Sequence, residues 1–223
     1  MNIRSNRKFS NIKLDIRERL ITDRAFEISK NIMKLSNPTR HQYRFRKYHM
    51  TVVNDIGLYL LKREQNLDNT QCTIFSIACL VHDAYKYKDD RLHASLAVDL
   101  FYDIINTIPD KYTNGYDEFI TECANGIKYH SNKEQWNLSV KYSAVARCLI
   151  IADILSKLDR KSIILAYFID HKSSKAPNKN FIAEVYNKKY KEAMDYIINH
   201  QKFFKSRINI DDIFYPCRKE ESR

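Results

Sequence analysis

The chain has 223 residues, which is enough for one domain with a sizeable hydrophobic core. Its three glycines and four prolines disfavour a turn-rich β fold, and its hydrophobic content of 44% disfavours wholesale disorder. The formal net charge of +11 favours polyanionic partners such as nucleotides, nucleic acid or an acidic membrane surface, although a diffuse solubilising charge accounts for it equally well.

Apolar residues recur at steps of three and four along most of the chain, with no alternating strand pattern, which predicts an all-α fold. Residues 1–13 are expected to form a flexible basic leader. Asn37-Pro38 should end the first helix, and Asp68 should cap the third. The predicted helices are 14–35, 40–64, 70–85, 92–108, 116–129, 139–158, 163–169 and 181–204. A linker occupies 172–179, the helix 181–204 is amphipathic and basic, and 205–223 is expected to form an ordered and then frayed tail.

This pattern divides the chain into a leader with its first helix (1–39), a helical core (40–172) and a C-terminal extension (173–223). The five cysteines are scattered through apolar segments without a Cys-x-x-Cys motif, as expected for reduced core thiols. Their odd number, and the lack of a signal peptide or a spanning apolar run, predict a cytoplasmic protein that does not enter the membrane.

One His-Asp pair stands out at the end of the apolar run 74–81. His82 and Asp83 follow a segment that is apolar almost all round, and such a helix is usually central in the fold. An unpaired carboxylate buried there is costly, and a metal ion removes that cost. Imidazole nitrogen and carboxylate oxygen are both ordinary ligands for Zn, Fe or Mn, so a metal site is favoured over a surface or capping pair.

Further candidate ligands lie before and after this pair. His49 falls on the inner face of helix 40–64, where it is either a ligand or a satisfied core histidine. His93 begins a helix and is either a ligand or exposed, and His130 ends one. Asp153 lies in the apolar stripe of helix 139–158, where it needs a metal or an Arg/Lys partner, of which a metal is favoured.

The chain resembles the HD superfamily of metal-dependent phosphohydrolases over residues 40–160. The resemblance lies in the order of the motif residues, which is His49, then His82-Asp83, then Asp153. Within that superfamily the chain looks most like the bacterial HD hydrolases of symmetrical diadenosine tetraphosphate. The resemblance implies an HD-domain helical bundle in which His49, His82, Asp83 and Asp153 hold one metal. It further implies that His93 and His130 hold a second, with Asp83 as a bridge. A nitrogen-rich set of this kind fits Fe or Mn better than Mg, while Zn, Ni and Co are also compatible.

The substrate side is expected to be basic. By resemblance, Lys86 takes the place of the lysine in the HD-x-x-K motif, so that Asp83 and Lys86 are the expected catalytic residues. The loop 131–137, with Trp136, is a natural rim for substrate. The chain departs from the diadenosine tetraphosphate subfamily at 131–134 and 158–160, both on the substrate side. Candidate phosphate-binding residues are Lys86, Arg91, Lys133, Lys157 and Arg160.

The sequence therefore predicts a metal-dependent phosphohydrolase that cleaves a phosphoester or phosphoanhydride bond of a nucleotide or dinucleotide with metal-activated water. Two alternatives use the basic surface: a helical module that binds nucleic acid, and a nuclease that acts on single strands. No Gly-rich phosphate-binding loop is present, which disfavours a nucleotide switch of the Walker type.

Overall fold

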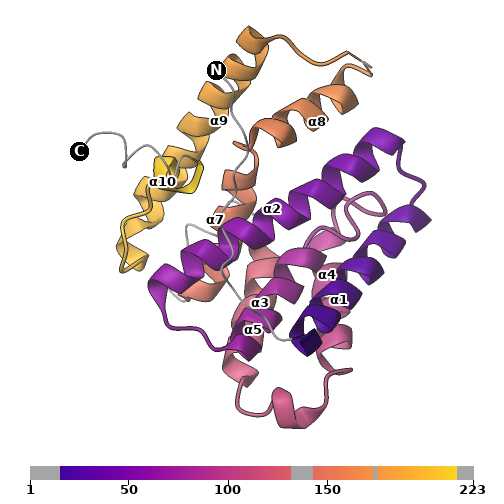
Figure 1. Ribbon diagram of the computed structural model, residues 1–223, viewed down its shortest axis with the longest axis vertical. Coiled ribbons are helices and arrows are strands. Elements are labelled where there is room, and N and C mark those ends of the chain that lie inside the picture. The colour runs from indigo at the N-terminus through magenta and orange to yellow at the C-terminus, as the bar shows by residue number, and fades with distance from the viewer. Residues whose placement is uncertain (1–15, 132–142, 173–174, 215–223) are drawn as a thin grey trace.

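The protein is built from helices that pack around the long helix α2, residues 40–64 (Figure 1). The computed structural model describes residues 16–131, 143–172 and 175–214. In these ranges there is no strand, which confirms the all-α prediction. The α-helices are α1 (Ile16–Leu35), α2 (Arg40–Glu64), α3 (Asn69–Val81), α4 (His93–Ile105), α5 (Asp117–Tyr129), α7 (Ala144–Ser156), α8 (Arg160–Asp170), α9 (Lys179–His200) and α10 (Ile210–Phe214). Two short 3₁₀ turns, Asp110–Tyr112 and Gln201–Phe203, accompany them.

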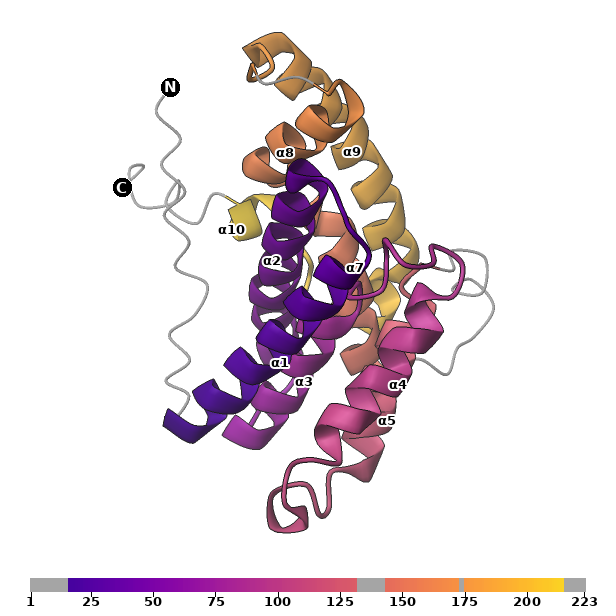
Figure 2. The same cartoon turned by 90° about the vertical axis from the view of Figure 1, so that its right-hand side faces the viewer.

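The middle of the molecule is formed by α2, α3, α5 and α7. Every residue of α3 from Cys72 to Val81 is buried, as the apolar sequence of this helix requires. Helices α1 and α4 pack on α3, and α5 packs on both α3 and α7. On the other side of α2 and α7, α8 and α9 form a helical hairpin (Figures 1 and 2).

Local capping sets the starts of two helices in the middle of the molecule, α2 and α3. Thr39 and Gln42 form a capping box at the start of α2, and Asp68 and Gln71 form one at the start of α3. Each box satisfies two backbone N–H groups that a helix start leaves without a partner. The prediction that Asp68 caps this helix is confirmed.

Several predicted boundaries are wrong. The helix predicted over 70–85 ends at Val81, and hydrogen-bonded turns follow it as far as Asp89. The helix predicted over 92–108 ends at Ile105, and α9 extends from Lys179 to His200 instead of 181–204. The short helix predicted at 163–169 is longer, because Asp159 caps α8 at its N-terminus.

The C-terminal segment joins the same hydrophobic core as the rest of the chain. Ala193 and Ile197 of α9 and Ile210 and Ile213 of α10 are buried in one cluster with residues of α2, α3 and α7. Helix α10 was not predicted, because its five residues are too few to show a helical period. The predicted leader (1–13), the loop 132–137 with Trp136, residues 139–142 and the end of the tail (215–223) lie outside the described residues. None of the described helices is long and apolar enough to cross a bilayer.

Candidate metal centre

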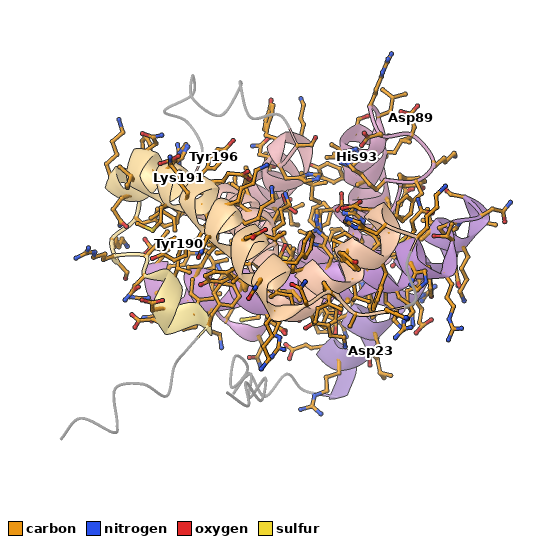
Figure 3. The ribbon with its side chains drawn as sticks, turned by 90° about the horizontal axis from the view of Figure 1, so that it is seen from above. Asp23, Asp89, His93, Tyr190, Lys191 and Tyr196 are labelled. Atoms are coloured by element: carbon orange, nitrogen blue, oxygen red, sulfur yellow. The ribbon has the colours of Figure 1, made fainter. Side chains whose placement is uncertain are left out.

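Five helices bring the six predicted ligands to one buried place. His49 comes from the middle of α2, His82 is the C-cap of α3 and Asp83 follows it. His93 is the first residue of α4, His130 is the C-cap of α5 and Asp153 lies in the last turn of α7. All six side chains are buried. Figure 3 labels His93 at the start of α4, on the side of the molecule away from Tyr190 and Tyr196 of α9.

Three of the histidines are oriented in the same way, through Nδ1 and the backbone carbonyl three residues earlier. A carbonyl oxygen only accepts, so Nδ1 carries the proton and, in the neutral ring, Nε2 keeps its lone pair. For His82 and His130 this bond also satisfies a carbonyl that the end of the helix leaves free. The Nδ1-to-oxygen distances are 2.8 Å from His82 to Cys79, 2.7 Å from His93 to Asp90 and 2.6 Å from His130 to Ile127.

The fourth histidine is oriented by a serine. The hydroxyl of Ser156 donates to the carbonyl oxygen of Asp153 at 2.6 Å. Its oxygen can then accept from Nδ1 of His49, which lies 3.0 Å away. His49 is thus held in the same tautomer as the others, with Nε2 turned inward.

Asp83 lies between two pairs of histidines. Its Oδ2 is 3.3 Å from Nε2 of His49 and 3.4 Å from Nε2 of His82. Its Oδ1 is 3.4 Å from Nε2 of His93 and 3.3 Å from Nε2 of His130. Asp153 joins the first pair, with Oδ1 3.0 Å from Nε2 of His49. The carboxylate of Asp83 therefore presents one oxygen to each pair, as a bridging ligand would.

The inward atoms are all electron-pair donors, as the ligand atoms of a metal ion are. Nε2 of His93 and Nε2 of His130 are 3.2 Å apart, although both rings already use their Nδ1 proton on a carbonyl. Nε2 of His49 and of His82 are buried without a hydrogen-bond partner. Two sets of ligand atoms, each lying within 4.8 Å of one another, could hold a metal ion: His49, His82, Asp83 and Asp153, and Asp83, His93 and His130. The donor set therefore fits one or two divalent metal ions.

Charge in the centre keeps both carboxyl groups ionised. Burial raises the pKa of Asp83, but it is outweighed, chiefly by the positive charge of Arg46, so this pKa lies well below its usual value. Burial is likewise outweighed at Asp153, chiefly by the positive charge of Lys157, so the pKa of Asp153 is also well below its usual value. Burial is the main reason that the pKa of His93 is lowered, which favours the neutral, ligating form.

Arg46 is a functional candidate that the sequence reasoning missed. It lies one turn before His49 on α2, and its guanidinium forms an ion pair with Oδ2 of Asp83. The rings of Phe45 and Tyr87 lie 5.3 and 5.5 Å from it. The spacing of three residues from a candidate ligand places Arg46 on the same face of α2, and this was the available signal.

The predicted phosphate-binding residues are placed unequally. Lys157 lies at the centre, with Nζ 3.0 Å from Oδ2 of Asp153 and a half-exposed side chain. Lys86 forms an ion pair with Asp90, four residues later, in the turns that follow α3. Arg91 and Arg160 are exposed and form no ion pair within the described ranges. Lys133 lies outside them.

Comparisons with protein-family models, with curated proteins and with solved structures found no match to this chain. The HD resemblance therefore depends on the order of the six residues.

Proposed function

We propose that this protein is a metal-dependent phosphohydrolase of the HD type that acts on a nucleotide or dinucleotide. One observation carries the proposal. Four histidine Nε2 atoms and the carboxylates of Asp83 and Asp153 face one another in the buried centre, and Nδ1 of each of these four histidines has its own hydrogen-bond acceptor. Hydrogen-bond acceptors of this kind commonly orient metal-binding histidines through the ring nitrogen that does not bind the metal. A set of core histidines that served packing alone would not need its lone pairs to face one another.

His49, His82, Asp83 and Asp153 would hold one divalent ion, and His93 and His130 would hold a second together with Asp83. Such ions would supply a Lewis acid for the phosphoryl group and a hydroxide nucleophile at neutral pH. The nitrogen-rich set favours Fe or Mn, and it is compatible with Zn, Ni or Co. Mg is the least suited, because it prefers oxygen ligands.

The chain itself supplies positive charge for the phosphate. Arg46 and Lys157 each pair with one carboxylate of the centre, so the unliganded cluster is close to neutral. Binding of divalent cations adds positive charge, which a phosphate group would offset. A guanidinium can bind two phosphate oxygens at once, so Arg46 is suited to orient the phosphoryl group, while Lys157 is suited to bind it as a point charge.

The first test is metal content. We expect the purified protein to contain Fe, Mn or Zn, and His82→Ala to lose most of it. His171 is exposed on the turn after α8, so His171→Ala is the matched control and should keep the metal content of the wild type. Equal metal content in both variants, or no metal in the wild type after supply of each ion, would remove the basis of the proposal.

The second test is hydrolysis. A panel of nucleotides and dinucleoside polyphosphates should show metal-dependent release of phosphate or nucleotide that a chelator abolishes. Asp83→Asn keeps the size of the side chain but not its charge, and should abolish this activity. Asp110→Asn changes an exposed carboxylate in a 3₁₀ turn and should leave it unchanged. A metal-loaded protein that hydrolyses nothing in the panel would refute the assignment of substrate class.

A further inference from the structure

The outer face of α2 carries a straight row of positive charge. Arg40, Arg44 and Lys47 are spaced by four and three residues, so they share one stripe of the helix, and all three are exposed. At about 1.5 Å per residue the row extends roughly 10 Å along the helix axis. Lys47 and His49 are two residues apart, about 200° around the helix, so the row faces away from the metal centre.

Among the described residues, no carboxylate forms an ion pair with this row. Residues 28–54 contain six lysines and arginines and no aspartate or glutamate. Within the part of the chain that the structure describes, Arg40, Arg44 and Lys47 form no ion pair. By contrast, Lys30 pairs with Glu27 nearby on α1.

The row works against the stability of its own helix. Like charges four residues apart repel each other, and cations in the first turns oppose the helix dipole. Solubility alone would be served equally well by mixed charges. The arrangement is therefore better explained by an anion that binds there.

Tyrosines border the row on both sides. By helical spacing Tyr43 lies to one side of it, with Lys34 and Lys47 at 5.8 and 6.0 Å from its ring. Tyr48 lies to the other side, with Nζ of Lys161 of α8 4.3 Å from its ring. Helix α8 runs alongside this half of α2 (Figure 1). Both tyrosines are partly exposed.

The geometry points to a docking surface for single-stranded nucleic acid on this face, formed by Arg40, Arg44, Lys47, Tyr43 and Tyr48. A line of cations follows a phosphodiester backbone, and partly exposed aromatic rings beside it stack unpaired bases. A duplex offers no free base faces on which the tyrosines could stack. The surface is separate from the metal centre, so it does not depend on the proposed hydrolase activity.

The test is the salt dependence of binding to a fluorescent oligothymidylate, measured by anisotropy with the full chain. The triple variant R40Q/R44Q/K47Q removes three phosphate contacts. It should reduce the slope of log K against log salt by about 2, and affinity at 0.1 M salt by on the order of 100-fold. Tyr43→Leu should lower affinity about 5-fold or more without changing the slope, because stacking is not ionic.

The control is K179Q/K188Q/K191Q, which removes the same charge from three exposed lysines of α9 (Lys191 is labelled in Figure 3). Its slope should stay within about 0.5 of the wild type. No binding by the wild type, or an equal loss in both triple variants, overturns the inference. So does a lowered melting temperature of R40Q/R44Q/K47Q, since the side chains would then support the fold. Binding to phosphatidylserine vesicles without binding to the oligonucleotide also overturns it, and would point to Leu35, which is 83% exposed at the end of α1.

Discussion

Ser156→Ala should weaken metal binding although Ser156 is not itself a ligand. Among the described residues, the hydroxyl of Ser156 is the one acceptor of Nδ1 of His49, at 3.0 Å. Without it, this buried N–H has no partner and the ring is free to adopt the other tautomer. Loss of a partner of this kind typically costs 10- to 100-fold in metal affinity, or about 1.4–2.7 kcal/mol.

The same change should also destabilise the metal-free protein. A buried donor left without an acceptor costs about 1–3 kcal/mol, which for a chain of this size corresponds to a loss of about 3–9 °C in melting temperature. The assays are a competition titration with a metal-binding dye and thermal unfolding in a chelator. Both quantities should fall together, because one hydroxyl serves both.

Ser162→Ala is the matched control. Ser162 is also buried, but its hydroxyl has no hydrogen-bond partner among the described residues. Its replacement should leave metal affinity unchanged and stability equal or slightly higher. Metal affinity of Ser156→Ala equal to that of the wild type would refute the view that Ser156 sets the orientation of His49.

Three further outcomes follow from the structure. Addition of the preferred metal at about 100 times its Kd should raise the free energy of unfolding by about 2.7 kcal/mol, which is measured as a higher melting temperature. A melting temperature that does not change with metal would contradict the presence of a folded metal site. Gly126→Ala should destabilise the protein by about 1–3 kcal/mol in urea unfolding, because the added Cβ would lie 3.2 Å from Cα of Ala146 in α7. This loss should exceed the gain from the better helix propensity of alanine. Stability equal to that of the wild type would show that α5 and α7 separate easily. Burial and the charge of Arg147 lower the pKa of His200 from 6.5 to about 4. As the pH falls, the unfolded chain therefore takes up the proton first. The contribution of neutral His200 to the free energy of unfolding is fully present above pH 6.5, and about 3 kcal/mol of it is lost as the pH drops to 4. His200→Gln should flatten this part of the pH profile, and a profile as steep as that of the wild type would exclude His200 as its source.

Buried His200 also shows how far local sequence reasoning reaches. Its Nδ1 lies 2.9 Å from Nη1 of Arg147, and the Arg147 guanidinium is 3.6 Å from the ring of Phe203. Arg147 is fully buried in α7, yet a lone arginine in an apolar stripe gives no indication of which residue will meet it. The partner lies 53 positions away, and only the packing of α9 on α7 brings it close.

The sequence by itself determined the helical class of the fold, the approximate position of every long helix and the burial of the candidate ligands on α2 and α7. Apolar spacing of three and four residues fixes which side of a helix is buried, so His49 and Asp153 were placed inside from their own segments alone. The same local rule identified Asp68 as a cap, since capping depends on residues within one turn.

Only the tertiary structure decided the contacts between helices. Ser156 meets His49 across 107 positions, and Arg46 meets Asp83 across 37. Periodicity states which face of a helix is buried but not which helix covers it. That choice is made by all the apolar faces together as they close one core, and the positions of the two carboxylates relative to the four histidines follow from it.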